Sequence, residues 1–117
     1  MEQVGAISAH IAHEIALVAT LDGVLVGCVR GIVDGRVCTV RGLVVEPARH
    51  GAGIGSRLLK ALEAELRGVE RIDLTTNTAM PGNVPFYERH GYRVTEHTRP
   101  MPGIVLAQMS KRFTEAG

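Results

Sequence analysis

The segment that decides the fold is Glu46-Pro47-Ala48-Arg49-His50-Gly51-Ala52-Gly53-Ile54-Gly55-Ser56. A valine-rich run precedes it and a leucine-rich run follows it, which predicts a turn from a strand into a helix. The first amides of a helix have no partner inside the helix and lie at the positive end of its dipole, so such a turn can bind a phosphate. Gly51, Gly53 and Gly55 would let a ligand approach the backbone, and Arg49 and His50 would add positive charge. The alternative is that the glycines only allow a tight connection between the strand and the helix and bind no ligand. That alternative stays open at this point.

A helix from Ile54 to Gly68 is predicted after this turn. Its apolar residues recur at helical intervals, at Leu58, Leu59, Leu62 and Leu66. A strand is predicted next, at residues 71–76. Strand, helix and strand in a row imply a right-handed parallel crossover.

The segment after this crossover predicts one more helix and two more strands. The helix covers residues 83–90 and closes at Gly91, because glycine is a common stop signal at the end of a helix. The strands lie near residues 92–97 and 104–110. Residues 98–103 between them contain two prolines and are predicted to form a connector.

Two hairpin signals precede the glycine-rich turn. Asp22-Gly23 follows an apolar run at residues 15–20 and begins a strand that continues to residue 33. Asp34-Gly35 ends that strand and is followed by another at residues 36–46. Short turns of this composition join antiparallel neighbours, so the first half of the chain is predicted to be an antiparallel meander.

The two cysteines can be placed in this meander. A turn at Asp34-Gly35 puts Cys38 opposite Gly31 and Cys28 opposite Arg41. Side chains alternate between the faces of a strand, so the two thiols would point to opposite sides of the sheet. This arrangement argues against a disulfide, and we expect both cysteines to be reduced and buried.

Composition predicts a single domain over residues 1–117, because 45% of the residues are hydrophobic and the length suits one core. The net charge of +1 gives no field that would attract nucleic acid or an anionic membrane surface. No apolar run has membrane-spanning length and the first residues do not resemble a secretory signal, so we expect a cytoplasmic protein.

Two motifs resemble those of the GNAT acetyltransferase family. The first is Leu43-Val44-Val45-Glu46-Pro47 followed by His50-Gly51-Ala52-Gly53-Ile54-Gly55-Ser56. The second is Asn83-Val84-Pro85-Phe86-Tyr87-Glu88-Arg89-His90-Gly91-Tyr92. The resemblance covers roughly residues 15–112. It implies an α/β fold of the mixed-sheet α+β kind, with an antiparallel N-terminal meander, a βαβ crossover and a shortened N-terminus.

The resemblance also implies a function, which is transfer of an acetyl group from acetyl-CoA to a primary amine by direct attack. The acceptor would be a small molecule or a peptide. The pantetheine arm would enter a V-shaped opening between the strands at residues 36–46 and 71–76. The implied cofactor-binding residues are Leu43, Val44, Val45, His50, Gly51, Ala52, Gly53, Ile54, Gly55 and Ser56, with Asn83 as a further candidate.

Tyr87 would be the catalytic residue in this family interpretation, as the acid that protonates the departing thiolate. The alternative for Tyr87 is a core aromatic residue beside Phe86. The general base stays unassigned, because the strand position that often supplies a glutamate in the family holds Thr75 or Thr76.

Three other functions fit the sequence to different degrees. A dinucleotide-binding fold fits poorly, because Ser56 stands where its fingerprint needs glycine and antiparallel strands precede the turn. A non-catalytic acyl-CoA-binding or regulatory module stays open, since only fourteen residues precede the first predicted strand. A toxin that acetylates charged transfer RNA would favour a basic patch that the near-neutral charge does not indicate.

The first residues predict one short helix, over residues 3–14, in which His10 and His13 share a face beside Glu14. No metal site is predicted there, because a third ligand cannot be named. Family members usually carry a strand and two helices before the hairpin. Their absence would leave the acceptor cleft open or completed by a second subunit, so a homodimer is expected.

Overall fold

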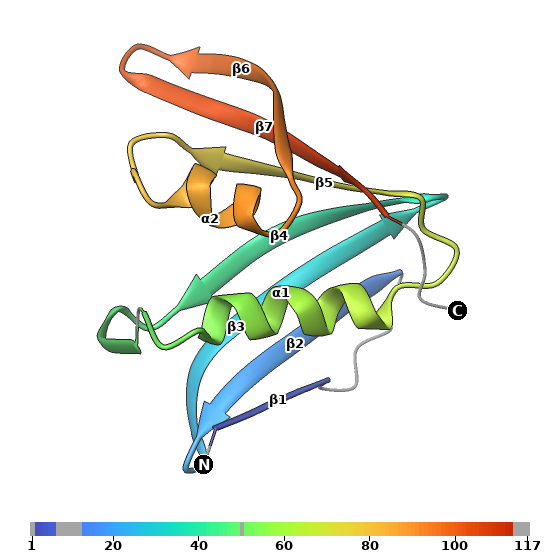
Figure 1. The fold of residues 1–117 in the computed structure, drawn as a ribbon, viewed down its shortest axis with the longest axis vertical. Helices are drawn as coiled ribbons and strands as arrows, with labels where there is room; N and C mark the ends of the chain where they lie inside the picture. The colour runs from blue at the N-terminus through green and yellow to red at the C-terminus, as the bar shows by residue number, and fades with distance from the viewer. Residues whose placement is uncertain (1, 7–12, 50, 114–117) are drawn as a thin grey trace.

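The computed structural model of the chain describes residues 2–6, 13–49 and 51–113. Within them, seven strands form one sheet, β1 Glu2–Ala6, β2 Glu14–Leu21, β3 Val24–Asp34, β4 Val37–Val45, β5 Arg71–Asn77, β6 Arg93–Met101 and β7 Ile104–Arg112. Their order in space is β1-β2-β3-β4-β5-β7-β6, and β4 with β5 is the parallel pair. Two α-helices accompany the sheet, α1 Ile54–Glu65 and α2 Asn83–Arg89, with a short 3-10 turn at Pro47–Arg49. The predicted mixed α/β fold is confirmed (Figure 1).

The first hairpin forms as predicted. Leu21 pairs with Val24, and the two residues between them, Asp22 and Gly23, have φ angles of 50° and 80°. Positive φ at both central positions is the conformation that matches the twist of antiparallel strands, and Asp-Gly is among the sequences that adopt it most easily. The predicted meander of β2, β3 and β4 is confirmed.

The second hairpin forms in a different register from the predicted one. Asp34 pairs with Val37, so Gly35 and Arg36 make the turn and Cys38 lies opposite Val33 rather than Gly31. The prediction was wrong because it placed the turn one residue too early. When the turn of a hairpin moves by one residue, the strand partner of every residue moves by two.

A β-bulge then moves the register by one further residue. Cys28 pairs with Val44, not with Arg41 as predicted, because the shifted turn moves its partner by two residues and the bulge between Cys28 and Arg30 moves it by one more. The two cysteines still lie on opposite faces: Cys38 is fully buried, Cys28 is half-buried, and both are free thiols. The absence of a bond between them is confirmed, although Cys28 is less buried than expected.

Helix α1 lies across one face of β2, β3 and β4 and supplies the centre of the core (Figure 1). Its side chains Leu58, Leu59 and Leu62 are completely buried. The sheet receives them closely because β3 has glycines below: a Cβ atom at Gly27 or Gly31 would lie 3.0 Å from a leucine methyl group.

The end of α1 comes earlier than predicted. The helix ends at Glu65 rather than at Gly68, and Leu66 is already extended with ψ of 137°. Leu66 and Val69 are buried against the core, which draws the chain off the helical path before the glycine is reached. Gly68 then makes the turn toward β5 with φ of 70°.

Strand β6 is longer than predicted. It runs to Met101, so residues 98–101 belong to a strand and only Pro102 and Gly103 remain as the connector. Proline is tolerated at position 100 because β6 is an edge strand of the described sheet and its outer amides need no partner. The register shift between Thr98 and Met101 absorbs the irregularity.

The predicted helix over residues 3–14 is wrong where the structure describes it. Residues 2–6 form β1, which pairs antiparallel with β2 from Glu2 opposite Leu21 to Ala6 opposite Leu17. His13 has a φ of 67° and Glu14 begins β2. Pairing of β1 satisfies backbone groups along the edge of β2, which outweighs a weak local helical preference. His10 lies outside the described residues.

Two features are absent from residues 2–6, 13–49 and 51–113. No helix there is long and apolar enough to cross a membrane. The same residues contain no group of three or more histidine, cysteine, aspartate or glutamate side chains placed to hold a metal ion.

Candidate functional site

Strands β4 and β5 separate after a short parallel contact. They pair at three positions, the last of which joins Thr39 to Asp73. Beyond it, Gly42 has a φ of 66°, and Gly42 and Leu43 together lie opposite the single residue Val29 of β3. A bulge of this kind bends its strand, so β4 turns away from β5 and the two strands open into a V (Figure 1).

A cleft of about 710 Å³ occupies this opening. Residues from β4, the glycine-rich turn, the start of α1, β5 and α2 form its walls. Of the predicted cofactor-binding and catalytic residues, the walls include Leu43, Val44, Val45, Gly51, Gly53, Ile54, Gly55, Ser56, Asn83 and Tyr87. Ala52 lies in the same turn but does not line the cleft, and His50 lies outside the described residues.

The cleft has further walls that lie outside the residues predicted to bind the cofactor or to catalyse transfer. They include Val40, Gly42, Leu74, Thr75, Thr76, Asn77, Met80, Phe86 and Arg89. Most of these residues lie on β5 and α2. The sequence signal that relates them to the site is that β5 lies between the two family motifs and α2 lies within the second one.

The glycine-rich turn presents the start of α1 to the cleft. Gly51 and Gly53 have φ angles of 87° and 80°, which glycine adopts at little cost. The amide of Arg57 donates to the carbonyl of Gly53 at 3.1 Å, which begins the helical bonding. The amides of Gly55 and Ser56 precede that bond, at the positive end of the helix.

Gly55 has a second role, which is contact between the two helices. A Cβ atom on Gly55 would lie 3.4 Å from Cζ of Phe86 and 3.7 Å from Cγ2 of Val45. The missing side chain therefore lets α2 approach the start of α1 and close that end of the cleft.

Charge on the described cleft walls is positive. Arg49 and Arg89 line the cleft, and no aspartate or glutamate is among its described lining residues. Arg49 lies 3.7 Å from Glu46, and both side chains are largely exposed, so this ion pair is weak. An anionic ligand would meet two guanidinium groups and a helix N-terminus at one end of the cleft.

Ser56 forms a hydrogen bond that links the two helices. Its Oγ lies 2.9 Å from Nε2 of His90. Burial lowers the pKa of His90, and the positive charges of Lys60, Lys111 and Arg89 lower it further, against the opposing charge of Glu63. The lowered pKa favours the neutral imidazole, and the hydrogen bond holds the serine hydroxyl against it.

Tyr87 lies on α2 beside the rings of two other aromatic residues. Its ring centroid is 5.1 Å from that of Phe86 and 5.9 Å from that of Tyr92, both in edge-to-face geometry. Burial raises the pKa of Tyr87, so the phenol keeps its proton. Within the described ranges no hydrogen bond involves its hydroxyl, which can donate to a ligand in the cleft.

Tyr92 differs from Tyr87 in having its hydroxyl engaged. Tyr92 is buried and donates a hydrogen bond of 2.8 Å to Oε2 of Glu63, whose other oxygen accepts one from Lys111 at 3.0 Å. Burial and the neighbouring carboxylate raise the pKa of Tyr92. Tyr92 therefore belongs to the packing between α1, α2 and β7.

Asn83 anchors the start of α2. Its Nδ2 donates to Oγ1 of Thr76 at 3.0 Å, and this threonine is the buried polar residue of β5. The side-chain nitrogen of Asn83 is therefore hydrogen-bonded to the sheet, and this bond positions α2. The side-chain oxygen of Asn83 is left for other contacts.

Comparison with known families gives one match. A family model described as an acetyltransferase (GNAT) domain matches residues 12–94 of the chain. A search of curated protein sequences gave no significant match.

Comparison with solved structures gives many similar folds. The ribosomal-protein-S18-alanine N-acetyltransferase of Escherichia coli is 19% identical with a TM-score of 0.86, over 100% of this chain and 97% of that one. A GNAT family acetyltransferase of Elizabethkingia anophelis, solved with acetyl-CoA bound, is 14% identical with a TM-score of 0.80, over 96% and 98% of the two chains. An aminoglycoside 6'-N-acetyltransferase complexed with coenzyme A is 24% identical with a TM-score of 0.75, over 90% and 76%.

Proposed function

Because the chain belongs to the GNAT acetyltransferase family, we propose that it transfers the acetyl group of acetyl-CoA to a primary amine. The observation that carries this proposal is the cleft between β4 and β5. It combines an open strand edge, a helix N-terminus and an unengaged phenol in one cavity.

The donor would lie along the cleft with its pyrophosphate at the start of α1. The amides from Gly53 to Ser56 and the nearby Arg49 and Arg89 offer hydrogen bonds and positive charge for this group. The pantetheine arm would follow the edge of β4 at Leu43–Val45, where β5 no longer pairs with it. Structures of neighbours with acetyl-CoA or coenzyme A bound support this choice of donor.

The chemistry would be direct transfer. The amine nitrogen attacks the thioester carbonyl, a C–N bond forms, the C–S bond breaks, and the thiolate of coenzyme A departs. Tyr87 would give its proton to this thiolate, and the proton lost by the amine would pass to water and restore the phenol. A phenol near pKa ~10 is a weaker acid than a thiol near ~8.5, so transfer at the sulfur depends on the position of the hydroxyl in the cleft.

The acceptor belongs to the class of primary amines of small molecules or peptides. The names of the neighbours include a ribosomal-protein alanine and an aminoglycoside as acceptors, which shows how widely acceptors vary on this fold. Specificity is set by side chains around the cleft rather than by the fold.

Calorimetry followed by a thiol assay tests the function. We expect acetyl-CoA and coenzyme A to bind with micromolar affinity and NAD not to bind, and we expect free thiol to appear when an acceptor amine is added. Binding without thiol release from a broad panel of amines would favour the alternative, a non-catalytic acyl-CoA-binding or regulatory module.

We also propose a homodimer, and expect the protein to act in the cytoplasm. Two large apolar side chains at the start of β3 are exposed, Val24 at 60% and Leu25 at 61%. Apolar surface of this kind favours a partner. Sedimentation at micromolar concentration tests the dimer, and a single species at monomer mass would contradict it.

A further inference from the structure

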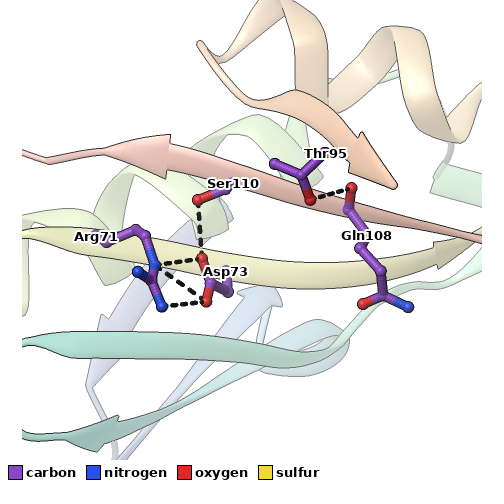
Figure 2. Close-up of polar contacts among 5 residues, drawn as sticks. All are labelled: Arg71, Asp73, Thr95, Gln108 and Ser110. Atoms are coloured by element: carbon purple, nitrogen blue, oxygen red, sulfur yellow. Dashed lines mark hydrogen bonds and ion pairs between the residues drawn. The ribbon is translucent and has the colours of Figure 1, made fainter. Parts of the chain in front are cut away.

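A groove runs along β5 on the face of the sheet opposite α1. The alternate residues Ile72, Leu74 and Thr76 are buried on the helix side, so the residues between them face the other way. We call this feature the β5 groove and define it by Thr75 together with the residues drawn in Figure 2, which are Arg71, Asp73, Thr95, Gln108 and Ser110.

The β5 groove is continuous with the acetyl-transfer cleft. It consists of two hollows of about 450 Å³ and 290 Å³. The larger hollow shares Leu74 and Thr75 with the walls of the cleft. The two hollows share Arg71, Thr95 and Ser110. A ligand in the groove could therefore reach the cleft where β4 and β5 separate.

The floor of the groove is ordered by hydrogen bonds within β5 and between β5 and its neighbour β7 (Figure 2). Asp73 accepts from Nε of Arg71 at 3.0 Å and from the hydroxyl of Ser110 at 2.8 Å. Thr75 donates to Oε1 of Gln108 at 2.6 Å. The groove is therefore a preorganised surface, which lowers the entropy cost of binding an extended ligand.

Positive charge gathers at the end of the groove that is distant from the cleft. The four arginines there are Arg36, Arg71, Arg93 and Arg112. Arg36 is paired with Glu70 at 2.7 Å and Arg71 with Asp73 at 3.0 Å. Among the described residues, no carboxylate forms an ion pair with Arg93 or Arg112, so two guanidinium groups remain to receive an anion.

The end near the cleft has the opposite charge. Glu96 of β6 lines the larger hollow and pairs with Gln108 of β7, whose partner on its other side is the shared residue Thr75 of β5. A positively charged amine would be attracted to this end, and an anionic group to the other.

On this basis we propose that the acceptor is an extended peptide whose terminal amine enters the cleft and whose acidic side chain, about four or five residues further on, binds Arg93 and Arg112. The spacing follows from β5, because Thr75 and Arg71 are four residues apart and a strand advances about 3.3 Å per residue. An extended peptide advances at the same rate. This inference rests on the proposed function and names its acceptor class.

A nucleic acid fits the groove less well than an acidic peptide. Asp73 and Glu96 lie along it and would repel a continuous line of phosphates. The charge changes sign along the groove, which matches a peptide with an amine at one end and a carboxylate further on.

The test compares matched peptides that differ only at the fourth and fifth residues. One carries glutamate there, one glutamine and one lysine, on the same alanine-glycine background. We expect kcat/KM to be roughly tenfold higher for the glutamate peptide than for the lysine peptide, mainly through KM, because the contact is remote from the reacting atoms. Arg93→Glu and Arg112→Glu should each reduce or reverse this preference.

Arg67→Glu is the matched control, since it makes the same charge change at an exposed position just after α1. It should leave the preference unchanged, and thermal unfolding confirms that each variant is folded. Equal kcat/KM for all three peptides, or an equal effect of the control, would overturn the proposal.

Binding of the fluorescently labelled peptides, measured by anisotropy, separates this inference from the proposed function. Preferential binding of the glutamate peptide that Arg93→Glu abolishes supports the groove even if no acetyl transfer is detected. Tighter binding of a single-stranded oligonucleotide than of the glutamate peptide would overturn the peptide proposal in favour of nucleic acid.

Discussion

The hydroxyl of Ser56, in the first turn of α1, lies 2.9 Å from Nε2 of His90, just after the end of α2. The bond joins residues that are 34 positions apart, and it connects the two helices that flank one end of the cleft. His90 is thereby placed behind the proposed phosphate site.

His90 should make stability depend on pH. Its pKa is lowered in the folded protein, chiefly by burial, so the unfolded chain binds more protons than the folded one below about pH 6.5. Stability contributed by the neutral imidazole is therefore present above that pH and is lost as the pH falls through the folded pKa. We expect the drop in melting temperature between pH 7.5 and 5.5 to be smaller in His90→Gln than in wild type. An identical drop in both proteins would contradict this prediction.

Tyr87→Phe should reduce turnover with little effect on donor binding. Loss of a positioned acid typically costs about 10²-fold in kcat, while the ring still packs against Phe86 and Tyr92. Steady-state kinetics gives kcat and calorimetry gives the Kd for acetyl-CoA, which should change by less than about twofold.

Tyr92→Phe is the matched control for that experiment. Its hydroxyl bonds to Glu63 in the packed interior, so its loss should lower the free energy of unfolding by about 1–3 kcal/mol and leave kcat near the wild-type value. The acid role of Tyr87 would be refuted if both variants lost turnover equally.

Gly53→Val should weaken acetyl-CoA binding by at least about tenfold. Residue 53 has φ of 80° at the start of α1, a conformation that disfavours valine, and no protein atom lies within 4 Å of an added Cβ, so the side chain would enter the space around the amides. Calorimetric titration measures the affinity.

Gly23→Val provides the comparison for Gly53→Val. Gly23 has the same φ of 80° and the same open surroundings, but it lies in the β2–β3 turn and does not line the cleft. It should lose stability from backbone strain and keep normal donor affinity. Equal loss of affinity in the two variants would show that strain, and not the phosphate site, is responsible.

Gly31→Ala should destabilise the fold by about 1–3 kcal/mol, because an added Cβ would lie 3.0 Å from both Sγ of Cys38 and Cδ1 of Leu62 in the core. Gly82→Ala adds the same methyl group where φ is −83° and nothing lies within 4 Å, so it should be neutral or slightly stabilising. Urea denaturation of the two variants measures the difference, and equal midpoints would contradict it.

Much of the cleft could be predicted from motifs in the sequence. The β4 segment, the glycine-rich turn and Tyr87 come together as the family resemblance implied, because each lies within an element whose type is set locally. The motifs do not indicate that His90 and Thr76 would bond to residues of the site. Their contacts with Ser56 and Asn83 join separate elements, and nothing in the local sequence of either residue indicates its partner.

Local chemistry determined the elements of this protein: Asp22-Gly23 favours positive φ and hence the first hairpin, and the leucine spacing of α1 favours a helix with one apolar face. Tertiary packing decided the rest. The Gly35-Arg36 turn and the bulge at Gly42 set the register of β3 with β4, the edge position of β6 allowed Pro100 inside a strand, and β1 paired with β2 where a helix was predicted. These outcomes depend on which backbone groups find partners across the sheet, and a pattern of neighbouring residues does not contain that information.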